Sequence, residues 1–338
     1  MRAFLFFAAV AAIVLLGLAW FTRRTARRIE QFLPARGQFI DVPGGRLHVR
    51  ESGPASAPAV LLVHGLGGQM SHFDYGMVEQ LARSFRVVVV DRPGSGHSPR
   101  DAMTPADVST QAQALAVLID QLGLGRPTVV GHSLGGAIAL TLALEHPASV
   151  GALALVAPLT QALDQAPQVF KALTIETRWV RTLFAWTLAT PGAIVGSKKV
   201  LAAVFAPERV PADFAVKGGG LHSLRPAQFL SASRDLQAVP LRMPHVQSRY
   251  AELTLPVSVL YGRQDAILDW QQNGQALVDR VPGARLELVD GGHMLPITQP
   301  ALTAEFVERA ARTALQQAAQ EGQDQAIQQG REARQLAS

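Results

Sequence analysis

Apolar residues fall along this chain in short continuous runs that alternate with longer stretches rich in Ala and Leu. Runs of Val, Ile and Leu are typical of strands that are buried on both faces of a parallel sheet. Each run is followed by a turn rich in Gly, Asp or His. We expect strands at residues 59–63, 87–90, 128–130, 152–156, 257–261 and 286–289. The alternation predicts an α/β fold, with a mostly parallel central sheet and helices on both faces.

A β-hairpin is expected ahead of these buried strands. Residues 38–42 and 46–50 alternate between apolar and polar side chains, and they flank the turn sequence Pro43-Gly44-Gly45. Alternation with a period of two is typical of a strand with one solvated face. The hairpin therefore begins a core that we expect to span residues 37–158 and 250–315.

Residues 159–249 interrupt this core. The alternation gives way to helical segments that we expect to be broken at Pro191, Gly192, Pro207, Pro211, residues 218–220, Pro226, Pro240 and Pro244. A structureless loop of this length is unusual inside a compact domain, so we predict an inserted helical cap. We expect its aromatic residues mainly in the interior of the cap, with some lining a substrate pocket: Phe170, Trp179, Phe184, Trp186, Phe205, Phe214 and Phe229.

The amino-terminal segment has the composition of a membrane-spanning helix. Residues 3–21 are uncharged and nearly all apolar, which is long enough to cross a hydrocarbon core of about 30 Å. A cleaved signal would have a shorter apolar region and a small-x-small cleavage site, whereas this run ends in Trp20-Phe21 and then arginines. We expect residues 1–30 to be an uncleaved single-pass anchor in the lipid bilayer. The Arg-rich carboxyl flank places the body on the cytoplasmic side.

Composition and charge narrow the function classes. The chain of 338 residues contains no Cys, which excludes a disulfide-stapled module, a thiol nucleophile and cysteine metal ligands. The formal net charge is +5, and residues 1–30 contribute four of these charges through five Arg and one Glu. The body is nearly neutral and has no basic cluster interleaved with aromatics, so nucleic-acid binding is rejected. The Gln- and Ala-rich tail, residues 316–338, is expected to be a frayed helix or disordered.

The strongest chemical motif is Gly131-His132-Ser133-Leu134-Gly135. It follows the predicted strand at 128–130 and precedes a helical stretch at 136–144. In this strand-turn-helix context, G-x-S-x-G predicts a nucleophile elbow, in which Ser133 sits on a strained turn with its hydroxyl exposed. The alternative is a Gly-rich turn that contains an incidental serine.

A serine nucleophile needs a base and an orienting carboxylate, and both are found later in the chain. His293 lies on a loop after the strand at 286–289, and Asp265 lies on a loop after the strand at 257–261. Both loops are expected at the same edge of the sheet. Asp269 and Asp290 are alternative acids, although Asp265 fits the motif better.

Backbone donors for an oxyanion are expected at two positions. The Gly-rich segment His64-Gly65-Leu66-Gly67-Gly68 follows a strand and can turn the N–H of Leu66 into the site. The second donor is the N–H of Leu134, the residue after the nucleophile. A plain tight turn is the alternative for the first segment. His64 and His97 are expected to form local hydrogen bonds, and His132 to be a variable neighbour of Ser133.

Five motifs together resemble the α/β-hydrolase superfamily over residues 37–315. They are HGLGG (64–68), DRPGSGHS (91–98), GHSLGG (131–136), YGRQD (261–265) and GGHMLP (291–296). The chain is similar to the members with a helical cap, which include esterases, cofactor-free haloperoxidase-like enzymes, epoxide hydrolases, haloalkane dehalogenases and carbon-carbon bond hydrolases. Ser133 stands where epoxide hydrolases and dehalogenases use aspartate, and HGLGG lacks the HGxGPG form of many carbon-carbon hydrolases.

The resemblance implies a serine hydrolase with the catalytic residues Ser133, Asp265 and His293. It would cleave an ester, thioester, lactone or amide of a small apolar acyl substrate through an acyl-serine, without a metal or an organic cofactor. Acyl transfer, perhydrolysis and carbon-carbon hydrolysis on the same triad are alternatives. A further alternative is a non-catalytic binding protein, but the intact triad disfavours it.

Overall fold

The structure is a computed structural model that describes residues 1–162 and 165–336. One eight-stranded sheet forms its centre, with the order β1-β2-β4-β3-β5-β6-β7-β8. The β1–β2 and β2–β4 pairs are antiparallel, and the other neighbours are parallel. The strands are β1 Gln38–Val42, β2 Gly45–Ser52, β3 Ala59–Val63, β4 Arg86–Val90, β5 Thr128–His132, β6 Ala152–Val156, β7 Val257–Gly262 and β8 Arg285–Val289. The predicted α/β fold with a mostly parallel sheet is confirmed.

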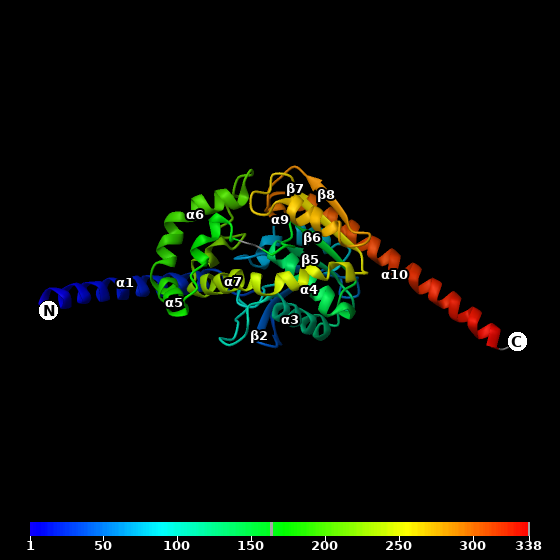
Figure 1. The fold of residues 1–338 in the computed structure, drawn as a ribbon, viewed down its shortest axis with the longest axis horizontal. Helices are drawn as coiled ribbons and strands as arrows, with labels where there is room; N and C mark the ends of the chain where they lie inside the picture. Colours follow the sequence, from blue (N-terminus) through cyan, green and yellow to red (C-terminus); the bar gives the residue numbers. More distant parts are fainter. Residues whose placement is uncertain (163–164, 337–338) are drawn as a thin grey trace.

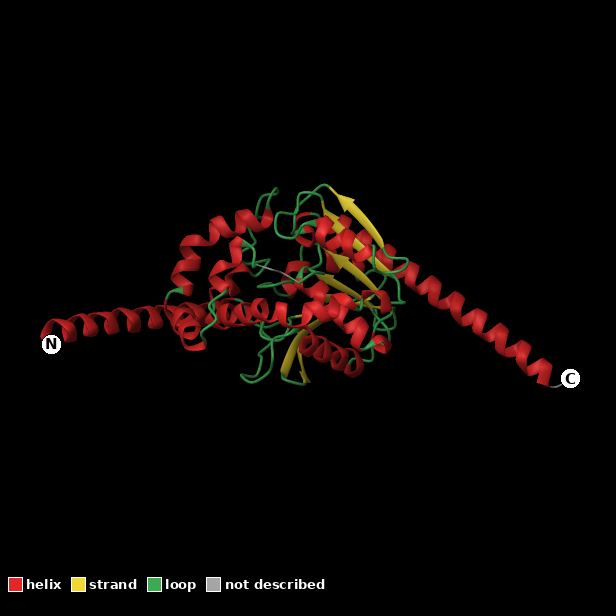
Figure 2. Cartoon of the chain, viewed as in Figure 1, coloured by secondary structure: helices red, strands yellow, loops and turns green. Residues whose placement is uncertain are grey.

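Helices cover both faces of the sheet (Figure 2). The helices of the described chain are α1 Arg2–Phe32, α2 Met77–Leu81, α3 Val108–Gln121, α4 Leu134–Glu145, α5 Arg178–Thr187, α6 Ala189–Phe205, α7 Pro226–Ser248, α8 Ala276–Val278, α9 Leu295–Thr298 and α10 Pro300–Leu336. Leu61 and Val63 of β3 share a buried cluster with α3 and α4, whereas Val60 and Leu62 share another with α2 and α10. Burial on alternate sides explains why the strand sequence is a continuous apolar run.

Between β6 and β7, the regular elements of the described chain are all helical, including α5, α6 and α7. Several expected helix breaks are wrong. Pro191 and Gly192 lie in the first turn of α6, where a proline is tolerated because its missing N–H would have no intrahelical acceptor. Pro240 and Pro244 lie inside α7, which stays continuous while Val239, Met243 and Val246 pack into the core. Tertiary packing thus overrides the local cost of proline here.

The cap aromatics take three different environments, which corrects the expectation that they form an interior or line a pocket. Phe205 and Phe214 are buried together, with ring centroids 5.0 Å apart. Phe170 lines a pocket beside Ser133. Trp179 and Trp186 are exposed on the outer face of α5, where they line an open surface groove that is separate from the pocket at Ser133.

Two long helices extend from opposite ends of the molecule (Figure 1). The amino-terminal one, α1, is long and apolar enough to cross a membrane. Its last turns pack on the cap, where Thr22, Ala26 and Ile29 are buried. At the other end, α10 covers the sheet and continues as a helix to Leu336, through the segment expected to be frayed or disordered.

Candidate active site

Ser133 lies on a strained turn between β5 and α4. Its backbone has φ 56° and ψ −122°, a conformation that costs a non-Gly residue free energy and recurs at functional sites. Two flanking glycines make the turn possible. A Cβ on Gly131 would lie 2.5 Å from the Gly135 carbonyl oxygen, and one on Gly135 would lie 2.2 Å from the Val63 carbonyl oxygen. Only glycine therefore fits at these two positions of the motif.

Backbone hydrogen bonds fix the strained residue in place. The Ser133 N–H donates to the Val156 carbonyl at 3.1 Å, and the Ser133 carbonyl accepts from Gly136 at 2.8 Å and from Leu159 at 2.9 Å. Behind it, α4 is almost entirely buried and presents its amino terminus toward the turn. The positive end of the helix dipole therefore faces the serine.

Asp265 and His293 meet beyond the ends of β7 and β8. His293 Nδ1 lies 2.8 Å from Asp265 Oδ2, and the two side chains are 5% and 0% exposed. The other carboxylate oxygen of Asp265 accepts from the backbone N–H groups of Ile267 at 2.8 Å and Leu268 at 2.9 Å. These bonds hold the carboxylate toward the imidazole, so that Nδ1 carries the proton and Nε2 is free to act as a base.

The two alternative acids lie elsewhere. Asp269 accepts a hydrogen bond from the Gln272 N–H at 2.8 Å and so caps the following helical turn. The Asp290 side chain is exposed, and the Asp290 carbonyl accepts a hydrogen bond from the Gln299 side chain. The structure therefore pairs His293 with Asp265.

His132 links the serine turn to the histidine loop, a role that the sequence analysis missed. Its Nε2 lies 2.9 Å from the His293 carbonyl oxygen, and the two rings are 5.0 Å apart between centroids. Burial, with His293 nearby, lowers the pKa of His132 well below its ordinary value. The neutral ring donates from Nε2 to the carbonyl and thereby fixes the loop that carries His293.

The two expected oxyanion donors lie beside the serine. Leu66 and Leu134 line the same pocket as Ser133, and a Cβ on Gly65 would come within 2.8 Å of the Ser133 Cβ. Within the described part of the chain, neither the Leu66 N–H nor the Leu134 N–H donates to another protein group. Unpaired backbone donors are rare in a protein interior, and here two of them adjoin a serine.

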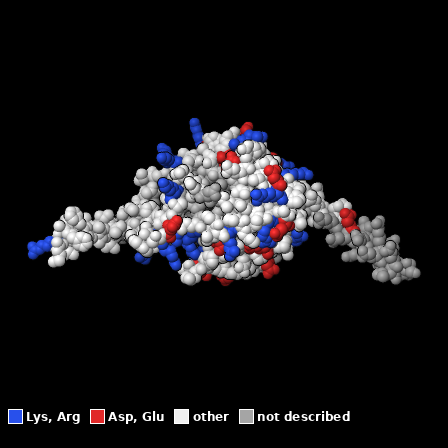
Figure 3. Space-filling view, viewed as in Figure 1, with Lys and Arg blue, Asp and Glu red and all other residues white. Residues whose placement is uncertain are grey.

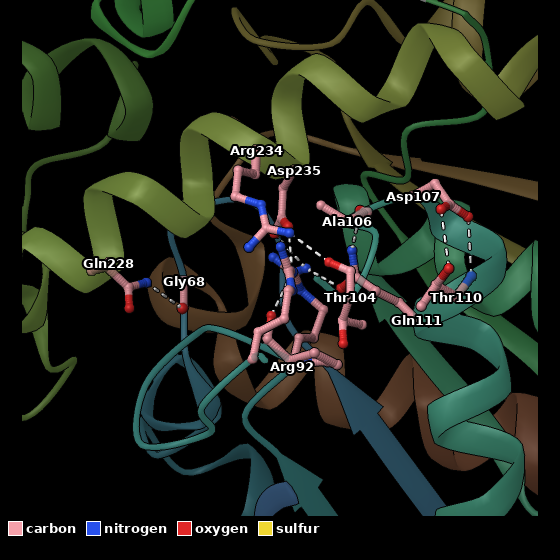
Figure 4. A network of polar contacts seen from close by, with 12 residues as sticks. Gly68, Arg92, Thr104, Ala106, Asp107, Thr110, Gln111, Gln228, Arg234 and Asp235 are labelled. Atoms are coloured by element: carbon pink, nitrogen blue, oxygen red, sulfur yellow. Dashed lines mark hydrogen bonds and ion pairs between the residues drawn. The ribbon is translucent and has the colours of Figure 1, made fainter. Parts of the chain in front are cut away.

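The loop of residues 64–68 is held by the buried Arg92, which Figure 4 shows beside Gln111 and Asp235. Arg92, fully buried, donates from Nε to the His64 carbonyl at 2.9 Å and from Nη2 to the Gly65 carbonyl at 2.9 Å. Its Nη1 pairs with Asp235 of α7 at 2.9 Å and with Gln111 at 2.6 Å. A single side chain thus connects the loop to the cap helix.

Two further contacts tie the cap to the catalytic loops. Gln228 of α7 donates to the Gly68 carbonyl at 3.3 Å, and the Glu208 carboxylate accepts from the Gly292 N–H at 3.1 Å. A Cβ on Gly292 would lie 2.0 Å from the Ala206 carbonyl, so the cap segment packs directly on the histidine loop. Arg92 belongs to the motif at residues 91–98, but no motif pointed to Asp235, Gln228 or Glu208, because their partners lie far away along the chain.

The pocket at Ser133 is small and almost wholly apolar. It has a volume of about 30 Å³, enough for about one water molecule. Its lining comes from the core and from the cap, and apart from Ser133 it consists of Leu66, Leu134, Leu159, Pro167, Phe170, Leu236, Val239, Ile267 and Leu268. Across the described residues, no group of three His, Asp or Glu side chains could hold a metal ion. The arrangement suits attack by a serine on a carbonyl with an apolar substituent.

Comparison with known proteins agrees with this geometry. The family described as the alpha/beta hydrolase fold matches residues 58–300. A protein of Pseudomonas savastanoi pv. phaseolicola named "Putative carbamate hydrolase RutD" is 30% identical over 254 residues, which cover 73% of this chain and 90% of that one.

Solved structures show the same fold. The enol-lactonase from Burkholderia xenovorans LB400 superposes with a TM-score of 0.66 and 24% identity, over 81% of this chain and 99% of its own. A membrane phospholipase A described as a bacterial virulence factor has a TM-score of 0.65 and 22% identity, over 93% of this chain and 99% of its own. The chain therefore belongs to the α/β-hydrolase family, and the class of its activity is that of a hydrolase.

Proposed function

We propose that this protein is a membrane-anchored serine hydrolase that cleaves a carboxylic ester bond through an acyl-serine intermediate. The observation that carries the proposal is Ser133, held in a strained conformation beside two unpaired backbone N–H groups. The Asp265–His293 pair supplies the base. The names of similar proteins refer to hydrolysis of carbamates, lactones and phospholipids, which all present a carbonyl carbon to a nucleophile.

In this mechanism, His293 Nε2 takes the proton of the Ser133 hydroxyl as its oxygen attacks the carbonyl carbon. Asp265 holds the imidazole and balances its transient positive charge. The N–H groups of Leu66 and Leu134 donate to the oxyanion, and His293 then gives its proton to the leaving alcohol. Water, activated by the same histidine, hydrolyses the acyl-serine. The apolar pocket favours an acyl group without charge.

The anchor is the second part of the proposal. The apolar part of α1 projects from the body as an exposed helix, which places many large apolar side chains in water unless lipid surrounds them. The arginines that follow residue 21 favour a body on the cytoplasmic side. Alkaline carbonate should leave the full-length protein in the membrane pellet, and its release into the supernatant would contradict the anchor.

The catalytic part is tested with Ser133→Ala and a matched control, Ser223→Ala, which changes an exposed serine of the cap. Hydrolysis of p-nitrophenyl butyrate should fall by about 10⁴-fold or more in Ser133→Ala and stay unchanged in Ser223→Ala. Retention of wild-type activity by Ser133→Ala would overturn the acyl-serine mechanism. If wild-type protein passes the acyl group to an added alcohol faster than to water, transfer is the better description.

A further inference from the structure

Large apolar side chains that remain exposed are concentrated in two regions of the molecule. One is α1, and the other is the outer face of α5 and α6, where Trp179 is 70% exposed, Trp186 41% and Val195 87%. Leu183, Leu188, Ile194 and Val200, on these two helices or at their junction, are exposed as well. In the described chain outside residues 1–32 and 178–205, the exposed large apolar residues are Phe39, Met103, Val216, Leu241 and Leu315.

The sequence of α5 explains its two apolar faces. Trp179, Leu183 and Trp186 follow one another at spacings of four and three residues, so they share one side of the helix. Ala185, with the stem of Arg181, is buried on the side that packs into the cap. A surface helix of a soluble domain normally carries polar residues on its outer side. The exposed apolar side of α5 therefore indicates a contact with another apolar phase.

This face lies next to the anchor. The last turns of α1 pack on α5, which buries Thr22, Ala26 and Ile29. Figure 1 shows that α1 leaves the body on the side where α5 and α6 lie, and that α6 runs across the direction of α1. If α1 crosses a bilayer, α5 and α6 are the part of the body that meets its surface.

Charge favours lipid over a second copy of the chain. Residues 165–205 contain five basic side chains, of which Arg181 is buried, and one acidic one, and Arg23, Arg24, Arg27 and Arg28 follow the apolar run of α1. In Figure 3 the projecting part of α1 is white except for a basic tip. Exposed Trp beside Lys and Arg is the composition of helices that lie in the interface of an anionic membrane. Two copies of this basic face would repel each other.

We propose that the outer face of α5 and α6 docks into the headgroup region of the same anionic phospholipid bilayer that α1 spans. The proposal rests on the anchor proposed above. Phe170, which lines the pocket at Ser133, precedes α5 closely in the chain. Docking therefore places the helical insertion that supplies Phe170 at the bilayer, which suits a hydrolase whose apolar substrate is dissolved in lipid.

The absence of cysteine makes a direct test possible, because each introduced thiol is the single labelling site. Full-length Ile13→Cys, Val195→Cys and Thr313→Cys are labelled with the fluorophore NBD and reconstituted into vesicles of phosphatidylcholine and phosphatidylglycerol. All three positions are exposed, and they lie in the anchor, in the cap face and in α10 on the opposite side of the core. Spin-labelled lipids with a shallow or a deep nitroxide quench a label that is in the membrane.

Deep nitroxides should quench the fluorescence of the label at residue 13. Shallow nitroxides should reduce the fluorescence of the label at residue 195 by at least about twofold, and neither kind should quench the label at residue 313. Quenching at 13 without quenching at 195 would overturn the docking and leave the anchor standing. No quenching at 13 would overturn the anchor, and the docking with it. Energy transfer between labels at 195 on two copies, without lipid quenching, would show that a second copy covers this face.

Discussion

Each residue of the proposed catalytic triad owes its position to contacts with neighbouring groups. Ser133 is strained because glycines on both sides let strand and helix approach, and Asp265 is aimed at His293 by two backbone N–H groups. The sequence could predict these residues because each directly follows a strand of the sheet. Parallel strands bring such residues to one edge, whatever their separation along the chain.

Replacing Asp265 by Asn tests the role of the acid. The amide oxygen can still accept from Ile267 and Leu268, so the loop should stay folded, but the imidazole loses its negatively charged partner. We expect kcat to fall by about 10³- to 10⁴-fold, as is typical when the acid of such a triad becomes an amide. Ester hydrolysis is measured beside Asp290→Asn, an exposed control. A larger loss in the control than in Asp265→Asn would show that the acid is wrongly assigned.

At the scale of elements, the sheet and the presence of a helical insertion could be predicted, but the course of the helices in the insertion could not. Buried strands are continuous apolar runs because both of their faces are covered, which makes them visible in the sequence. The course of α7 was hidden, since Pro240 and Pro244 look like helix ends until the packing of Met243 and Val246 is known. The contact between Arg92 and Asp235 was hidden as well, because 143 positions separate them.

Arg92 links Asp235 of the cap to the loop of residues 64–68, so Asp235→Ala should lower the stability of the fold strongly. Asp235 is buried between Arg92 and Arg100, which would lose their charge partner. Breaking a buried pair in this way typically costs about 3–5 kcal/mol of the free energy of unfolding. Urea unfolding in detergent micelles measures this loss of stability. The control is Glu308→Ala, which removes an exposed ion pair with Arg312. Equal unfolding midpoints in the two variants would show that the network does not stabilise the fold.

If the outer face of α5 contacts the bilayer, its removal should slow hydrolysis of a lipid-dissolved ester but not of a soluble one. Trp179→Ser combined with Trp186→Ser should lower the rate on an ester dissolved in vesicles by about tenfold, because lost burial of aromatic surface weakens membrane contact. The rate on a soluble short-chain ester should not change, since neither side chain reaches the pocket. Met103→Ser, a similarly exposed position outside the cap, is the control. Equal losses on both substrates would instead point to damage to the cap.

At the scale of the whole molecule, the fold buries histidines in a neutral state. Burial lowers the pKa of His72 to about 4 and that of His222 to about 3, and it places those of His64 and His132 well below the ordinary value. Below pH 6.5 the unfolded chain binds protons that the folded chain does not, so stability falls as the pH falls. The loss due to His72 levels off only near pH 4.

His72 alone should therefore reduce the free energy of unfolding by about 2 kcal/mol between pH 7 and pH 5, and the other buried histidines should lower it further. Urea unfolding of the full-length protein in detergent measures this loss, and His72→Gln, with a neutral side chain, should show a smaller one. A free energy of unfolding that is the same at pH 7 and pH 5 would contradict the burial of neutral histidines.

The central claim, that Ser133 is an activated nucleophile, is tested most directly by a fluorophosphonate probe followed by peptide mapping. The account predicts one phosphonylated residue, Ser133, in the wild-type protein, and no labelling in Ser133→Ala. It also predicts labelling at least about 10²-fold slower in a His293→Gln variant, because the serine then lacks its base. Labelling at another serine, or undiminished labelling of Ser133→Ala, would contradict the account.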